Sequence, residues 1–251
     1  LAVLSFIPMA VSWLWILGIM AIGCMEFNIV NIILATFIFG QGDDYTIFMA
    51  EGAMYEYAYR RKMLASYKHS IIISALIMFI GIGTLIIAKH PALHSLAEVT
   101  IAGMFSVVLM AYVFPPLIFK YLVSKNGKYR LRPLSLTYLF HHSKDDSRYL
   151  HYLVLDRYRY KGVEVFGAVK RNLRRTHDYQ EWIADQDASQ PVVVENAGYG
   201  EQAMMFALLH PKAQVIAVEA DAEKCLLMKY SMKGIVNNVE IINSNKYERE
   251  N

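Results

Sequence analysis

The sequence predicts two kinds of structure in one chain: an all-α helical membrane bundle over about the first 120 residues, then a small α/β domain. The 251 residues are 55% hydrophobic with a mean hydropathy of +0.28, which is too apolar for an ordinary soluble domain. No charged residue occurs between Leu1 and Met25, whereas charged residues recur throughout the part after Lys125. From Pro191 onward, short β-rich and helical stretches alternate. The chain therefore faces lipid first and water second.

Four segments are long and apolar enough to cross about 30 Å of hydrocarbon as helices, which takes roughly 20 residues each. They run over about residues 1–23, 27–50, 70–88 and 99–122. Helices are expected because an open strand would leave backbone groups unpaired in lipid. The first residue is Leu and no basic stretch precedes the apolar run, so we expect a piece of a longer protein and not a signal peptide.

The basic residues of the short loops predict the orientation. The loop after the second span and the segment after the fourth are basic, whereas the opposite side carries only Lys89. The basic loops, and with them the C-terminal tail, are therefore expected in the cytoplasm. Residues 51–69 mix tyrosines with basic residues, which favours an amphipathic helix at the cytoplasmic interface over an ordinary loop.

Two adjacent acids, Asp43 and Asp44, interrupt the second span, and apolar residues continue after them. An ionisable group at membrane depth costs about 2.5–3.5 kcal/mol on insertion scales, so it should face a bundle interior or a wet cavity. Desolvation and mutual repulsion favour the protonated form of at least one carboxyl, which could then exchange a proton near neutral pH. In the alternative interpretation, the helix ends at residues 40–42 and the aspartates cap a segment in contact with water.

The run Gly42-Asp43-Asp44-Tyr45 resembles the Gly-x-Asp-Tyr motif of the MMPL exporters, a branch of the RND superfamily. The surroundings over residues 1–123 agree with this family: Asn31 lies in the motif helix, an Arg-Arg loop follows, and a later helix ends in Pro115-Pro116.

The resemblance implies that Asp44 and Tyr45 form a proton relay, with Asp43 at the variable position, and that proton influx drives export of lipids or hydrophobic compounds. It implies the last four helices of a six-helix half in a bacterial inner membrane. The expected partners are membrane lipids, the cargo, and the missing first half of the same transporter. On that half, an acid or a Ser/Thr would hydrogen-bond Tyr45.

Residues 124–190 are predicted to form a basic helical linker, with one or two helices between 156 and 183. Their basic cluster suits an anionic lipid surface better than nucleic acid, although a plain solvated face is favoured over either. The cluster comprises Lys170, Arg171, Arg174 and Arg175.

Residues 191–251 alternate strand and helix, with strands at 192–194, 214–218 and 239–242. The glycine turn after the first strand and Glu219 at the end of the second resemble the nucleotide-binding half of class I S-adenosylmethionine-dependent methyltransferases. The resemblance implies a Rossmann-like fold in which Asn196, Gly198, Gly200 and Glu219 bind S-adenosylmethionine. Asn196 stands where that family has Asp, and Gln202 replaces its third glycine. The methyltransferase fold has about seven strands, and three of them are predicted here, which favours a non-catalytic tail over an enzyme.

Two functions follow as hypotheses: the C-terminal part of a proton-driven exporter, or a membrane-anchored methyltransferase that uses S-adenosylmethionine. The acid pair favours the first, because a pure anchor gains nothing from two carboxylates that oppose insertion. No metal site is predicted, since Cys24 and Cys225 lie far apart, and His90 and His94 fit a solvated loop.

Overall fold

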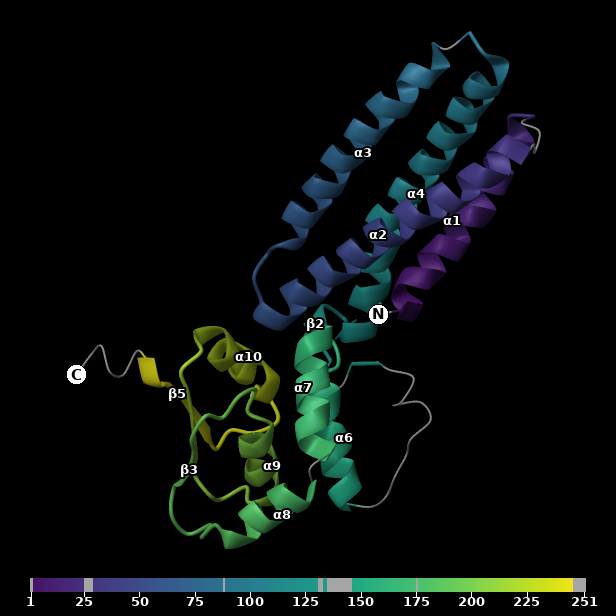
Figure 1. Ribbon diagram of the computed structural model, residues 1–251. Coiled ribbons are helices and arrows are strands. Elements are labelled where there is room, and N and C mark those ends of the chain that lie inside the picture. Colours follow the sequence, from purple (N-terminus) through teal and green to yellow (C-terminus); the bar gives the residue numbers. More distant parts are fainter. Residues whose placement is uncertain are drawn as a thin grey trace. The chain divides into compact units, whose positions relative to one another are not determined.

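The computed structural model describes residues 2–24, 29–87, 89–130, 133–134, 146–174 and 176–245 (Figure 1). The chain divides into two compact units. The helical unit comprises residues 1–56 and 61–121, and the tail unit comprises residues 57–60 and 122–251. The second unit thus includes the last three residues of a long helix of the first, together with Arg60.

The helical unit consists of long helices that run up and down. Their bounds are Ala2–Ile22 for α1, Ile29–Tyr59 for α2, Leu64–Ile86 for α3 and Pro91–Val123 for α4. Among the described residues, three segments are long and apolar enough to cross a membrane: Ser5–Ile22, Leu64–Ile86 and Leu93–Val123. They correspond to the first, third and fourth predicted spans, and α2 is not one of them.

Helix α2 has 31 residues and is long enough to cross a bilayer, but Asp43, Asp44 and their polar neighbours make it less apolar. It runs unbroken through Gly40-Gln41-Gly42, so the alternative in which the helix ends there is wrong. Because successive i→i−4 hydrogen bonds continue through these glycines, the aspartates lie inside a helix and not at its cap.

The interfacial helix predicted over residues 51–69 is also wrong. Helix α2 continues to Tyr59, the chain turns, and α3 begins at Leu64. Arg60 stands just after α2 with a left-handed φ of 55°, a conformation that commonly ends helices. The Glu56 carboxylate accepts a hydrogen bond from the Leu64 backbone N–H at 3.2 Å, which satisfies one of the free donors at the start of α3.

Small residues allow the helices of this unit to approach one another closely. A Cβ on Gly42 of α2 would lie 2.9 Å from a methyl group of Val107 in α4. A Cβ on Gly103 of α4 would lie 2.5 Å from the Cδ1 of Ile38 in α2. The α2–α4 contact therefore uses a glycine from each helix, as is common between membrane helices.

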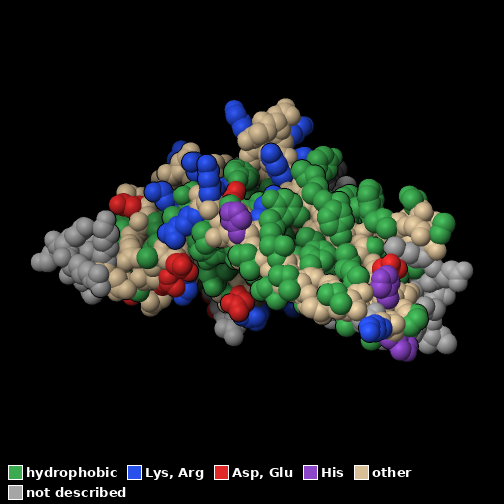
Figure 2. All heavy atoms as spheres, turned by 90° about the horizontal axis from the view of Figure 1, so that it is seen from above, with side chains coloured by type: hydrophobic (Ala, Val, Ile, Leu, Met, Phe, Trp, Pro, Cys, Tyr) green, Lys and Arg blue, Asp and Glu red, His purple; other side chains and the backbone are tan. Residues whose placement is uncertain are grey.

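Large apolar side chains are exposed on the helical unit. Many hydrophobic side chains are visible in the space-filling view (Figure 2). Six large apolar residues of α3 are between 39% and 71% exposed, which would be costly in water. They are Ile72, Ile73, Leu76, Ile77, Ile80 and Ile86.

The tail unit begins with a short hairpin of β1 (Ser124–Lys125) and β2 (Lys128–Tyr129). Asn126 and Gly127 form its two-residue loop, both with positive φ, which is the usual chemistry of tight hairpins. Helices α6 (Asp146–Tyr158), α7 (Val163–Arg174) and α8 (Thr176–Asp185) follow.

The segment predicted as a helical linker contributes to the core of the tail unit. Val165, Val169 and Leu173 recur every four residues along α7 and are buried in one cluster with the sheet residues. Lys170 and Arg171 lie on the exposed face of the same helix, whereas Arg175 is outside the described residues.

A three-stranded parallel sheet, in the order β3-β4-β5, lies at the centre of the tail unit. The strands are Val192–Val194, Val215–Glu219 and Val239–Asn243, so each of the three predicted strands is present. Helix α9 (Glu201–Leu209) connects the first two, and α10 (Ala222–Met232) connects the last two. The apolar core between helices and sheet includes Met204, Phe206 and Met228.

Candidate functional site

The acid pair lies in the middle of α2, where two consecutive carboxylates point in different directions. Successive residues of an α-helix are about 100° apart around its axis. Asp43 is half-buried and Asp44 is exposed, whereas Tyr45 is only 7% exposed. None of the hydrogen bonds or ion pairs within the described part of the chain involves either carboxylate. The Thr46 hydroxyl donates to the backbone carbonyl of Asp43 at 2.9 Å and not to its carboxylate.

Tyr45 is directed into the helical unit and reaches α3. Its hydroxyl lies 3.1 Å from the hydroxyl oxygen of Ser74, and either group can donate the hydrogen bond. The sequence predicted a partner for Tyr45 on a missing half of the protein. In the structure the partner comes from the same group of helices. The sequence did not predict Ser74 as this partner, because nothing in its sequence surroundings indicates a tyrosine 29 positions earlier.

Asp44 belongs to an exposed stripe on α2 that also contains Thr36, Gly40 and Phe48. These four residues recur every four positions, so they lie along one face of the helix. Nothing lies within 4 Å of a Cβ built on Gly40. A helix that packed against this stripe would therefore contact two small residues, Thr36 and Gly40, and then the carboxyl group of Asp44.

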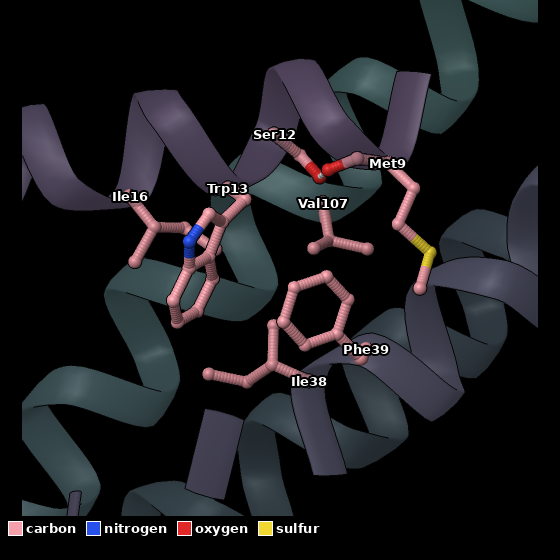
Figure 3. A pocket seen from close by; sticks show the side chains of 7 residues that line it. All are labelled: Met9, Ser12, Trp13, Ile16, Ile38, Phe39 and Val107. Carbon is pink, nitrogen blue, oxygen red and sulfur yellow. Dashed lines mark hydrogen bonds between the residues drawn. The ribbon is translucent and has the colours of Figure 1, made fainter. Parts of the chain in front are cut away.

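A narrow crevice lies between α1, α2 and α4 (Figure 3), and its walls are almost wholly apolar. It has no room for a water molecule. The ring centroids of Trp13 and Phe39 lie 4.8 Å apart there, and the Ser12 hydroxyl donates a hydrogen bond to the carbonyl oxygen of Met9. The full lining is Met9, Ser12, Trp13, Ile16, Ile38, Phe39 and Val107. With its one hydroxyl already bonded, this crevice provides no polar path to the acids.

The second candidate site is the turn between β3 and α9. Asn196, Gly198 and Gly200 all have positive φ, at 48°, 59° and 81°. A Cβ on Gly200 would lie 2.6 Å from the sulfur of Met228, so this position requires glycine for both its conformation and its packing. The predicted glycine turn is therefore a real structural feature.

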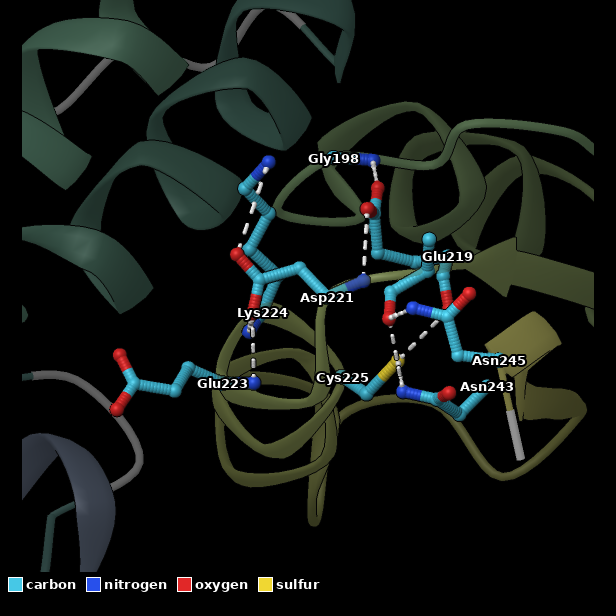
Figure 4. A network of polar contacts seen from close by, with 9 residues as sticks. Gly198, Glu219, Asp221, Glu223, Lys224, Cys225, Asn243 and Asn245 are labelled. Carbon is cyan, nitrogen blue, oxygen red and sulfur yellow. Dashed lines mark hydrogen bonds and ion pairs between the residues drawn. The ribbon is translucent and has the colours of Figure 1, made fainter.

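Glu219 ends β4 and is directed toward this turn (Figure 4). One carboxylate oxygen accepts the Gly198 backbone N–H at 2.7 Å, and the other accepts the Asp221 backbone N–H at 3.2 Å. The side chain is 8% exposed. The structure thus brings together the predicted cofactor residues, but it uses Glu219 to hold the turn.

A hollow of about 730 Å³ lies beside the same edge of the sheet, between α10 and the end of β5. Its lining includes Asp221, Cys225 and Asn243 but none of the turn residues 196–200. Burial raises the pKa of the Cys225 thiol, whose sulfur contacts the Asn243 amide at 3.7 Å. The carboxyl ends of parallel strands are where ligands commonly bind in open α/β sheets.

Sequence reasoning missed a set of cations in the tail unit: the half-buried Arg60 and the buried Arg157 and Lys161. Arg157 and Lys161 are 6% and 4% exposed. They were missed because they are far from Arg60 along the chain and lie among many other basic residues. Within the described part of the chain, no three potential ligands lie close enough together to hold a metal ion, and His94 contacts Glu98 at 3.4 Å.

No protein-family model matches the sequence, and no curated protein or solved structure shows significant similarity to it.

Proposed function

We propose that this chain is the C-terminal membrane part of an exporter driven by the proton-motive force, with lipids or other hydrophobic compounds as cargo. The observation that carries the proposal is the pair of carboxylates inside the unbroken helix α2, between helices whose outer surfaces are apolar. In such surroundings a carboxylate is expensive unless it has a function in moving protons or ions. On this proposal α2 is a fourth span, beside α1, α3 and α4.

Asp44 is the main protonatable group of the proposed relay, and Tyr45 is its companion. The hydrogen bond between Tyr45 and Ser74 supports the companion role, because it links the residue that follows Asp44 to the neighbouring helix α3. Asp43 is half-buried on a different face and has a secondary role.

The exposed stripe of Thr36, Gly40, Asp44 and Phe48 needs a covering surface if α2 spans a membrane. Small residues are typical of places where another membrane helix packs closely. We propose that the first half of the same transporter covers the stripe and provides polar groups opposite Asp44. On this proposal the protein lies in a bacterial inner membrane, with lipids around its helices and the tail unit in the cytoplasm.

The test replaces the Asp44 codon in the chromosomal gene, so that the substitution is present in the protein as the cell makes it. Cells with Asp44→Asn are loaded with the hydrophobic dye Nile red, re-energised, and followed for dye efflux. The account predicts normal protein levels and loss of energy-dependent efflux, because asparagine cannot exchange a proton. Glu51→Gln, an exposed acid later on α2, is the matched control and should leave efflux unchanged. Efflux at the unaltered rate with Asp44→Asn would refute the relay.

The second candidate function is that of a membrane-anchored methyltransferase that uses S-adenosylmethionine. The glycine turn at Gly198 and Gly200, the acid Glu219 and the parallel order β3-β4-β5 support a Rossmann-like cofactor half. Calorimetric titration of the purified chain with S-adenosylmethionine tests it. Saturable heat of binding would favour this function, and no heat up to millimolar cofactor would exclude it.

A further inference from the structure

Three cationic side chains of the tail unit lie close enough to repel one another. Arg60 follows α2, Arg157 lies on α6, and Lys161 follows α6. Burial lowers the pKa of Lys161, and each of the two arginines lowers it further, which shows that the three charges act on one another. Such a cluster is unfavourable unless each charge has a compensating partner.

Arg157 has such partners. Its guanidinium donates to the backbone carbonyls of Ser231 at 2.7 Å and Lys233 at 3.1 Å. These carbonyls belong to the C-terminal end of α10, where the helix dipole concentrates negative partial charge. Arg157 therefore caps α10.

Arg60 and Lys161 are not compensated in this way. Among all described residues, none accepts a hydrogen bond from the buried Nη1 of Arg60 or from the buried Nζ of Lys161. Both cations instead lie against one ring, that of Tyr57, at 4.8 Å and 4.3 Å from its centroid. A cation–π contact offsets only part of the cost of burying an ion. Within the described residues, no anion compensates these two cations.

An exposed aromatic side chain covers Arg60. The Arg60 guanidinium lies 3.5 Å from the ring centroid of Tyr129, which is 51% exposed and belongs to the β1–β2 hairpin. An exposed ring can change rotamer at little cost and open a path to Arg60, and from there to Lys161 against the same Tyr57 ring. The same hairpin carries Lys125 and Lys128, both exposed, so the approach is positively charged.

We propose that Arg60 and Lys161 bind the phosphate group of an anionic ligand that enters past Tyr129. The planar guanidinium can donate two parallel hydrogen bonds to a phosphate, and the lysine adds a compact charge with three donors. The phosphate belongs either to a phospholipid headgroup or to a soluble phosphate. This site is independent of the proposed transport function, because it lies wholly within the tail unit.

The first experiment measures the melting temperature of the purified full chain in a nonionic detergent, at constant ionic strength. In one arm the protein is titrated with inorganic phosphate, with sodium chloride as the reference. In the other arm it is titrated with phosphatidic acid in mixed micelles, with phosphatidylcholine as the reference. A phosphate-dependent rise identifies a soluble source, and a rise with phosphatidic acid alone identifies a lipid source. No rise in either arm overturns the proposal.

Variants locate the site. Lys161→Met and Arg60→Gln should each weaken binding about tenfold or more, as expected when a charged hydrogen bond is lost. Lys170→Met, an exposed lysine of α7, is the matched control and should bind normally. Equal binding by wild type and both site variants would place the ligand elsewhere and contradict the proposal.

A measurement on the wild-type chain covers the case in which the variants do not fold. Trace acetylation at pH 8 is followed by mass spectrometry with and without the ligand. A bound phosphate should hold Lys161 in its charged form against Arg60 and Arg157 and reduce its labelling several-fold, while labelling of Lys170 stays constant. Unchanged labelling of Lys161 at saturating ligand would contradict the proposal.

Discussion

Replacing Gly200 by alanine should destabilise the tail unit by about 2–4 kcal/mol. The backbone at Gly200 has φ +81°, and a residue with a Cβ loses about 1–2 kcal/mol in the left-handed region. The new Cβ would also lie 2.6 Å from the Met228 sulfur and 2.7 Å from the Met232 methyl group. Overpacking typically costs about 1–3 kcal/mol, and the flexible methionines place this site toward the lower end.

The assay is urea unfolding of the full chain in detergent, followed by the fluorescence of Trp182. Trp182 packs against Phe206 in the core of the tail unit, with ring centroids 5.7 Å apart. Replacing Trp13 and Trp15 by phenylalanine leaves Trp182 as the sole tryptophan of the three in the sequence. The unfolding midpoint then reports the tail unit alone.

Gly167→Ala in α7 is the matched control. The nearest atom to its new Cβ would be the Arg171 guanidinium at 3.6 Å, an ordinary contact. Alanine inside a helix should stabilise by about 0.5–1 kcal/mol. A Gly200→Ala variant whose free energy of unfolding lies within about 0.5 kcal/mol of the parent would refute the account of this turn.

Two further predictions concern a buried charge and a helix contact. Burial, with Arg60 and Arg157, lowers the pKa of Lys161 from 10.5 to about 7, so between these pH values only the unfolded chain carries the proton. In phosphate-free buffer, wild-type stability should therefore rise from about pH 7 to about pH 10 by up to about 4 kcal/mol. In Lys161→Met most of this rise should vanish, and at about pH 6 the variant should be more stable than the wild type. A free energy of unfolding, measured with urea, that depends on pH equally in both proteins would contradict this. In the helical unit, Gly52→Ala would put a Cβ 2.6 Å from the Tyr67 ring and should lower the melting temperature in detergent, whereas Gly81→Ala, with no atom within 4 Å, should not. Equal melting temperatures for these two variants would mean that Gly52 is not at a close helix contact.

The sequence was most informative where local chemistry decides the structure. The glycine turn at Gly198 and Gly200 and the strand ending at Glu219 were predictable, because glycine adopts positive φ at low cost and a short apolar run between turns favours a buried strand. The turn at Arg60 was not, since the mixed aromatic and basic stretch around it suits an interfacial helix equally well.

The side-chain contacts of the sites could not be predicted, because they depend on packing between distant segments. Asp44 and Tyr45 stood out through an acid pair in an apolar run, but the link from Tyr45 to Ser74 requires the arrangement of α2 and α3. The juxtaposition of Arg60 with Lys161 likewise joins residues far apart in the sequence, and periodicity along a single helix carries no information on it.

The most direct test of the central claim asks whether Asp44 is protonated at membrane depth. Membranes that contain the protein are treated with dicyclohexylcarbodiimide, an apolar reagent that modifies protonated carboxyl groups, and the peptide with Asp43 and Asp44 is analysed by mass spectrometry. The account predicts modification of Asp44 in the wild type and in Asp43→Asn, and no modification at this position in Asp44→Asn. An Asp44 that stays unmodified at neutral pH, as a solvated carboxylate would, contradicts the relay.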